Sequence, residues 1–93
     1  MFNTEPGWQG FLELCLRSES KEILDTLFDL FLTFEEKKNL ALRYLIIQGL
    51  LAKKETQREL AQRLQVSIAK ITRGSNELKR MSPQQLQYLK ERI

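Results

Sequence analysis

Apolar side chains recur every three to four residues along most of the chain, which is the period of one face of a helix. The first such set consists of Trp8, Phe11, Leu12, Cys15 and Leu16. The second consists of Ile23, Leu24, Leu27, Phe28 and Phe31. No run of useful length alternates apolar and polar residues, and hairpin signals such as Asn-Gly are absent. The pattern therefore predicts an all-α protein.

Signals for helix starts divide the chain into six helices. Three segments have the form of a capping box, in which a hydroxyl residue and a Glu or Gln three positions later bond each other's backbone N–H groups. These boxes are Thr33–Glu36, Thr56–Glu59 and Ser82–Gln85. Pro6 and Pro83 suit the first helical position, and Ser67 suits a cap. The first predicted helix begins at Pro6, and the second includes residues 23–31. The next three cover about 33–52, 57–64 and 68–79, and the last begins at Pro83.

The third of these helices is apolar over most of its circumference. Its apolar residues are Leu40, Ala41, Leu42, Tyr44, Leu45, Ile46, Ile47, Leu50 and Leu51. A helix that is apolar nearly all round has to be surrounded. Because the other short helices of a 93-residue chain can hardly surround it alone, the sequence predicts a partner chain.

Charge is divided unevenly between the two parts of the chain. Residues 1–36 contain two basic and eight acidic side chains, whereas residues 37–80 contain eleven basic and three acidic ones. The basic segment indicates a nucleic-acid binder; the alternative is a solvated basic surface. The acidic residues of 1–36 fall mostly on outer helix faces and are interpreted as solvated.

Catalysis and metal binding have little support in the sequence. Histidine is absent, so there is no Ser-His or Cys-His pair and no imidazole ligand, and the scattered glycines form no phosphate loop. Cys15, the single cysteine, is expected as a buried thiol, and Trp8 as a core residue. We find no signal peptide and no apolar run long enough to cross a membrane. The sequence thus predicts a cytoplasmic protein that is not an enzyme and does not contact a membrane.

The helices at 57–64 and 68–79 are short and close together, as in a helix-turn-helix. In the second helix, the spacing predicts Ile68, Ile71, Ser75 and Leu78 on the inward face. The outward face then contains Ala69, Lys70, Thr72, Arg73, Asn76 and Glu77, which are small or polar enough to enter a DNA major groove. The alternative is a packing unit of helices with no DNA role. Gly74 is unusual in a helix interior and predicts a close approach to the backbone there.

These segments resemble the tryptophan-responsive repressor family of the trp operon. The resemblance lies in Thr56-Gln57-Arg58-Glu59-Leu60 and in Ile68-Ala69-x-Ile71-Thr72-Arg73-Gly74-Ser75-Asn76-x-Leu78-Lys79. It extends upstream through Leu30-x-Leu32-Thr33 and Arg43, and covers roughly residues 30–80 by identity. It implies a sequence-specific repressor that L-tryptophan activates as corepressor, with no other cofactor, and that regulates genes of tryptophan biosynthesis or uptake.

The resemblance also implies an architecture and a set of sites. The single domain 1–93 would form an intertwined homodimer, with residues 1–52 and 81–93 as its core and 53–80 as the DNA-reading head. The indole ring would lie between Arg43 and Arg73, close to Gly74. The ligand carboxylate would meet Arg73 and Thr33, and its ammonium the backbone carbonyls of Leu30 and Leu32. The residues expected to contact operator DNA are Lys53, Lys54, Gln57, Arg58, Ile68, Ala69, Lys70, Thr72, Ser75, Asn76 and Lys79.

The chain departs from the family pattern at several of these positions. Glu77 stands near the expected ammonium, where the family commonly has Ser. Ala61 and Leu45 replace basic residues, Lys70 replaces a Thr, and the turn at 65–67 lacks the familiar glycines. Two alternatives follow: a helix-turn-helix regulator with another indole effector or none, and a helical module that binds proteins.

Overall fold

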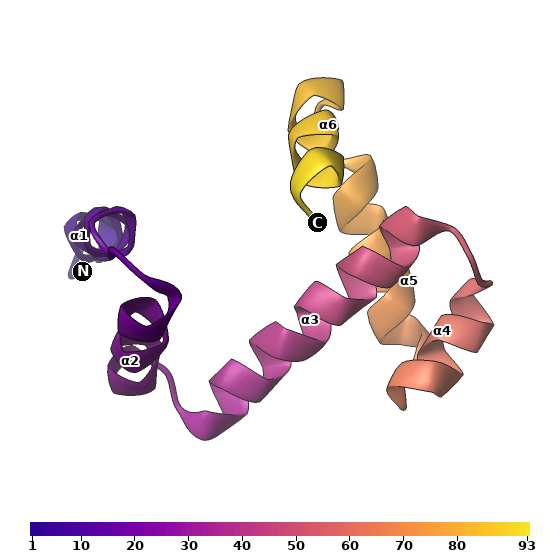
Figure 1. The fold of residues 1–93 in the computed structure, drawn as a ribbon, viewed down its shortest axis with the longest axis horizontal. Helices are drawn as coiled ribbons and strands as arrows, with labels where there is room; N and C mark the ends of the chain where they lie inside the picture. The colour runs from indigo at the N-terminus through magenta and orange to yellow at the C-terminus, as the bar shows by residue number, and fades with distance from the viewer. The chain divides into compact units, whose positions relative to one another are not determined.

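The computed structural model describes the whole chain, Met1–Ile93, as six helices without strands (Figure 1). They are α1 (Glu5–Leu16), α2 (Lys21–Phe31), α3 (Phe34–Ala52), α4 (Gln57–Leu64), α5 (Ile68–Lys79) and α6 (Pro83–Arg92). The all-α prediction and the predicted helices are thereby confirmed. The chain divides into two compact units, Met1–Lys37 and Lys38–Ile93, which we describe separately. None of the helices is both long and apolar enough to cross a membrane.

The predicted caps are formed. Thr33 Oγ1 accepts a hydrogen bond from the Glu36 N–H at 3.1 Å, and Glu36 Oε1 accepts one from the Thr33 N–H at 2.8 Å. Both bonds of the box are also present at Thr56 with Glu59 and at Ser82 with Gln85. Each box satisfies N–H groups that a helix start leaves without partners. The start of each of these three helices is therefore fixed by local sequence.

Aromatic stacking and one lysine organise the first unit. The Phe11 ring lies 5.9 Å from Trp8, 5.8 Å from Phe28 and 5.4 Å from Phe31, centroid to centroid. Lys37 Nζ binds Asp25 and Asp29 of α2 at 3.0 and 2.7 Å. Two core predictions are wrong for the single chain, because Trp8 remains 54% exposed and Cys15 is only half-buried. Trp8 thus stacks on Phe11 but keeps about half of its surface exposed.

The second unit has a small core built from three helices. It consists of Ile46 from α3, Leu60 and Ala61 from α4, and Ile71 from α5, with Leu50, Leu64 and Val66 packed against it. Leu60 and Ile71 are fully buried. A Cβ built on Gly49 of α3 would lie 2.5 Å from Leu60 Cδ1, so this glycine lets α4 pack closely on α3. The core thus holds α4 and α5 against the C-terminal half of α3.

Much of α3 stays uncovered within the chain. Only Ile46 and Gly49 of this helix are buried. Leu40, Tyr44 and Leu45 remain 47%, 52% and 38% exposed. The sequence predicted that one chain could not surround this helix, and the exposed side chains agree with that expectation.

Candidate functional site

Helix α5 is positioned by a cap at its start and one buried side chain. Ser67 Oγ accepts a hydrogen bond from the Lys70 N–H at 3.3 Å, and Ile71 is fully buried against α3 and α4. The predicted outward residues are all exposed: Ala69, Lys70, Thr72, Arg73, Asn76 and Glu77. These side chains of α5 are therefore accessible from solvent.

The inward face of α5 was predicted correctly except at its first residue. Ile71 is buried, and Ser75 and Leu78 are half-buried, but Ile68 is 49% exposed. The prediction for Ile68 is wrong because this residue opens the helix. Its Cβ points toward the helix N-terminus, beyond the contact centred on Ile71. An apolar side chain is thus presented on the surface beside Ala69.

A short turn links α4 to α5, and an ion pair ties α4 to the segment that precedes it. Gln65 ends α4 in the left-handed conformation, with φ 56° and ψ 44°. The Arg63 Nε and Nη2 atoms both donate to Glu55 Oε1, at 2.9 and 2.6 Å. Hydrogen bonds from the backbone N–H and the hydroxyl of Thr56 lower the pKa of Glu59. Gln57 and Arg58 follow this cap directly and are exposed.

The cations expected to contact DNA have no acidic partner in the chain. Ion pairs are confined to Arg17, Lys37, Arg63, Arg80 and Arg92. The exposed side chains of Lys53, Lys54, Arg58, Lys70 and Lys79 are therefore unneutralised. Unneutralised cations on one segment are available to anionic groups such as phosphates.

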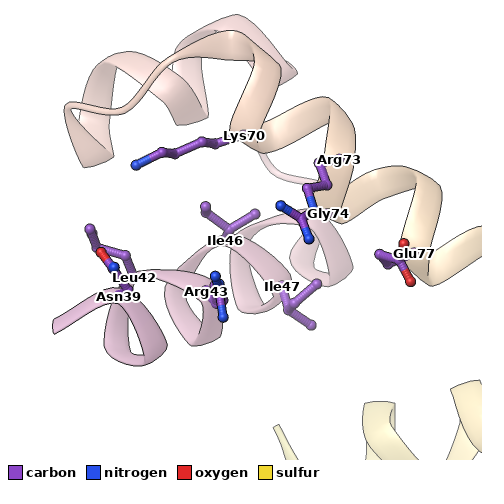
Figure 2. A pocket seen from close by; sticks show the side chains of 9 residues that line it. All are labelled: Asn39, Leu42, Arg43, Ile46, Ile47, Lys70, Arg73, Gly74 and Glu77. Carbon is purple, nitrogen blue, oxygen red and sulfur yellow. The ribbon is translucent and has the colours of Figure 1, made fainter. Parts of the chain in front are cut away.

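A cleft of about 540 Å³ opens between α3 and α5, within the second unit (Figure 2). Its walls are Asn39, Leu42, Arg43, Ile46 and Ile47 from α3, and Lys70, Arg73, Gly74 and Glu77 from α5. In Figure 2, Arg73 extends from α5 toward α3, where Arg43 lies on the opposite wall. The structure thus brings together four predicted ligand residues, namely Arg43, Arg73, Gly74 and Glu77.

Gly74 has a structural cause that the sequence did not reveal. A Cβ on this residue would lie 2.9 Å from Ile46 Cγ2 and 3.4 Å from Leu50 Cδ1. The close approach to the backbone of α5 is therefore made by α3 itself. The resemblance implied that the ligand ring required this glycine, but helix packing alone already requires it.

The remaining predicted ligand residues, Thr33, Leu30 and Leu32, belong to the first unit. The Thr33 hydroxyl oxygen accepts the bond of its capping box, and the hydroxyl also helps to lower the pKa of the Glu36 carboxyl group. The Leu30 and Leu32 carbonyls at the end of α2 accept no backbone hydrogen bond. Both kinds of group can serve a polar ligand: a hydroxyl donates to a carboxylate, and a free carbonyl accepts from an ammonium.

Sequence reasoning missed the apolar part of the cleft. Asn39, Leu42, Ile46 and Ile47 line it but were not singled out as ligand residues. For Asn39, Ile46 and Ile47 the available signal was their spacing from Arg43, because positions three and four apart lie on one helix face. Lys70 was assigned to DNA alone, yet it also lines the cleft. No group of acidic, Cys or His side chains in the chain could hold a metal ion.

The sequence matches a known family over nearly its whole length. Residues 6–93 match the family described as Trp repressor protein. A Trp operon repressor homolog of Chlamydia trachomatis serovar D is 51% identical over 89 residues, covering 96% of this chain and 95% of the relative. A homolog of Chlamydia caviae is 51% identical over 88 residues (95% and 87%). One of Histophilus somni strain 2336 is 38% identical over 86 residues (92% and 81%).

Proposed function

The chain belongs to the Trp repressor family, and we propose that it represses transcription by binding operator DNA with L-tryptophan as corepressor. Membership makes it a DNA-binding transcriptional regulator and not an enzyme, and decides against a module that binds only proteins. One observation carries the finer proposal. The cleft with Arg43 and Arg73 has α5 as one wall, and α5 also presents the exposed outward face.

In this proposal α4 and α5 are a helix-turn-helix, and α5 reads DNA. Its outward residues are small or polar, which suits entry into a major groove about 12 Å wide. Base-edge contacts fall to Ile68, Ala69, Lys70, Thr72, Ser75 and Asn76. Phosphate contacts fall to Lys53, Lys54 and Lys79, and Gln57 and Arg58 meet phosphate or a guanine edge. Eight of these eleven side chains are exposed and polar or charged. The other three are Ile68 and Ala69, which are exposed and apolar, and Ser75, which is half-buried.

L-Tryptophan would occupy the cleft between α3 and α5. An indole ring between two guanidinium groups gains cation–π attraction, at about 0.5–2 kcal/mol per contact. Arg43 and Arg73 are suited to this role because neither is engaged in an ion pair. Arg73 would bind the ligand carboxylate. The family resemblance implies further polar contacts from Thr33, Leu30 and Leu32, which belong to the first unit.

We propose that the active form is an intertwined homodimer. The exposed apolar residues of α3, Leu40, Tyr44 and Leu45, would be covered by the second chain. Residues 1–52 and 81–93 would form its core and 53–80 its reading head. Sedimentation is then expected to give twice the 11.0 kDa chain mass. Dimeric helix-turn-helix proteins, the Trp repressor among them, read half-sites about 34 Å apart, so the ligand would act by setting the spacing of the two α5 helices.

The ligand can shift this arrangement only by its differential affinity for the DNA-binding form. A ligand wedged between α3 and α5 satisfies that condition, because it contacts both the helix that reads DNA and the helix that supports it. The regulated genes would be those of tryptophan biosynthesis or uptake, and the protein would act in the cytoplasm, beside the chromosome.

The test is DNA-fragment selection with L-tryptophan, followed by gel shifts with and without it. We expect L-tryptophan to tighten binding at least about tenfold, a coupling of about 1.4 kcal/mol. Arg73→Ala should abolish this response, whereas Lys90→Ala on α6, which removes a cation outside the cleft, should keep it. An undiminished response of the Arg73 variant would refute the ligand site.

A second candidate keeps DNA binding but has another indole effector, or none. Glu77 favours it, because this carboxylate lines the cleft where the family commonly has Ser. Calorimetric titration with L-tryptophan, indole and other indoles separates the two candidates. A ligand that binds more tightly than L-tryptophan and drives DNA binding would support the second.

A further inference from the structure

We propose that Glu77 makes the cleft selective for a zwitterionic aromatic amino acid over indole acids that lack the amino group. The inference rests on the proposed function, because it takes the cleft between α3 and α5 as the tryptophan site.

The cleft walls carry charges of both signs. Three cations line the cleft, Lys70, Arg43 and Arg73, and Glu77 is its only carboxylate. A ligand with a carboxylate alone meets the cations favourably but is repelled by Glu77. A ligand with an ammonium alone is attracted by Glu77 but is repelled by the cations. Only a ligand that carries both charges, close together, interacts favourably with the cations and with the carboxylate of α5.

Glu77 and Arg73 do not pair with each other, although their spacing allows it. These residues are four apart on α5, a spacing at which side chains of opposite charge commonly pair. No such pair forms, because Glu77 Oε1 instead accepts from Arg80 Nη1 at 3.3 Å and Arg73 has no acidic partner. Figure 2 shows both side chains on the cleft side of α5, with Gly74 between them. Two opposite charges are therefore held apart, with room for a ligand to join them.

The geometry of an α-amino acid matches this separation. Residues four apart on a helix are about 6 Å apart along its axis. The carboxylate and ammonium of one amino acid branch from a single carbon, so each can reach one of the two side chains while the indole ring lies over Arg73. Charge-assisted hydrogen bonds of this kind are the stronger ones.

Binding requires Glu77 to exchange its partner, and the structure makes that exchange easy. The Glu77 and Arg80 side chains are 59% and 77% exposed, so their ion pair is solvated on the surface. Solvated pairs are weak, and a ligand ammonium in a partly enclosed cleft can replace the Arg80 guanidinium. Arg80 is then released toward solvent or toward DNA phosphate.

The test is calorimetric titration of the full chain, without DNA, with three probes: L-tryptophan, indole-3-propionate and tryptamine. The first has both charges, the second lacks the ammonium and the third lacks the carboxylate. We expect wild type to bind L-tryptophan at least about tenfold more tightly than indole-3-propionate. Glu77→Gln keeps the shape and removes the charge, and should reduce this ratio by about tenfold.

Opposite shifts of two probes distinguish charge recognition from a general disturbance. In Glu77→Gln, indole-3-propionate should bind more tightly than to wild type, and tryptamine more weakly. Arg80→Gln is the matched control: it breaks the same ion pair but keeps the carboxylate, so the wild-type ratio should persist. An unchanged ratio in Glu77→Gln, or a loss of all three probes together, would overturn the proposal. Absence of L-tryptophan binding to wild type would instead overturn the proposed function itself.

Discussion

Gly74 and Ile46 set how closely α5 approaches α3. A Cβ on Gly74 would lie 2.9 Å from the Cγ2 methyl of Ile46, closer than nonbonded carbon atoms pack. Ile46 cannot move aside easily, because it is buried and a β-branched side chain has one strongly preferred rotamer in a helix. The same contact borders the cleft, since both residues line it. Helix packing and cleft shape therefore depend on one methyl group facing one glycine.

Gly74→Ala is expected to lower the free energy of unfolding by about 1–2 kcal/mol. Overpacking costs about 1–3 kcal/mol, and the better helix propensity of Ala returns at most about 1 kcal/mol. Ile46→Leu removes the Cγ2 methyl, so the double variant should regain part of the loss. Urea denaturation of both single variants and the double variant, at one protein concentration, measures this coupling.

Gly10→Ala is the matched control for the glycine effect. A Cβ at Gly10 in α1 would meet nothing within 4 Å, so only the propensity gain remains. This variant should be neutral or more stable by up to about 1 kcal/mol. If Gly74→Ala behaves like Gly10→Ala, the contact with Ile46 does not limit the approach of the two helices.

The helices were predictable from the sequence because their starts are encoded locally. Thr33, Thr56 and Ser82 each bond an N–H group only three residues away, so the signal and the structure occupy the same segment. The outward face of α5 was predictable for a related reason, because helical periodicity assigns faces once a helix is known. The grouping of Arg43 with Arg73 came from the family resemblance, and the cleft agrees with it.

Contacts between helices were harder to predict. The partner of Gly74 is Ile46, 28 positions earlier, and no local pattern links the two. The exposure of Ile68 likewise depends on its place at the first residue of α5, beyond the contact centred on Ile71, rather than on periodicity. At the end of α4, Gln65 occupies a left-handed conformation that favours glycine, so tertiary context sets this turn against local preference.

The capping boxes are expected to make stability depend on pH in the acid range. Hydrogen bonds from the backbone of Thr33 and Thr56 lower the pKa of Glu36 and Glu59 below the ordinary 4.5. A lowered folded-state pKa gives stability that is full above pH 4.5 and is lost as pH falls through the lower value.

Replacing both glutamates by glutamine tests this dependence. Gln85 already forms a capping box with Ser82, so the caps should survive while their titration disappears. We expect the melting temperature of the double variant to fall less than that of wild type between pH 6 and about pH 3. Equal losses in the two proteins would show that other carboxylates set the acid sensitivity.

The phosphate contacts assigned to Lys54 and Lys79 predict a change in salt dependence. Each contact removed should reduce the slope of log K against log salt by about 1, with affinity lowered across DNA sequences. These residues are preferable to Lys53, because its left-handed φ of 54° lets a substitution change the stability of the loop as well as its charge. Lys21→Ala in α2 lies outside the reading head and should leave the slope unchanged. Fluorescence anisotropy at several salt concentrations measures the slopes of the Lys54, Lys79 and Lys21 variants. An unaltered slope for Lys54→Ala would show that Lys54 does not contact a phosphate.

Ile68 and Ile71 provide a matched pair that separates stability from DNA recognition. They lie three residues apart on α5, but Ile71 is 0% exposed and Ile68 is 49% exposed. Ile71→Ala should lower the free energy of unfolding by about 2–5 kcal/mol, because it leaves a cavity among Ile46, Leu60 and Ala61. Ile68→Ala should cost less than about 1 kcal/mol in stability.

If Ile68 touches a thymine methyl, as apolar side chains do in the major groove, its loss should weaken specific DNA binding and leave non-specific binding intact. Equal weakening on both kinds of DNA would mean that Ile68 lies outside the groove.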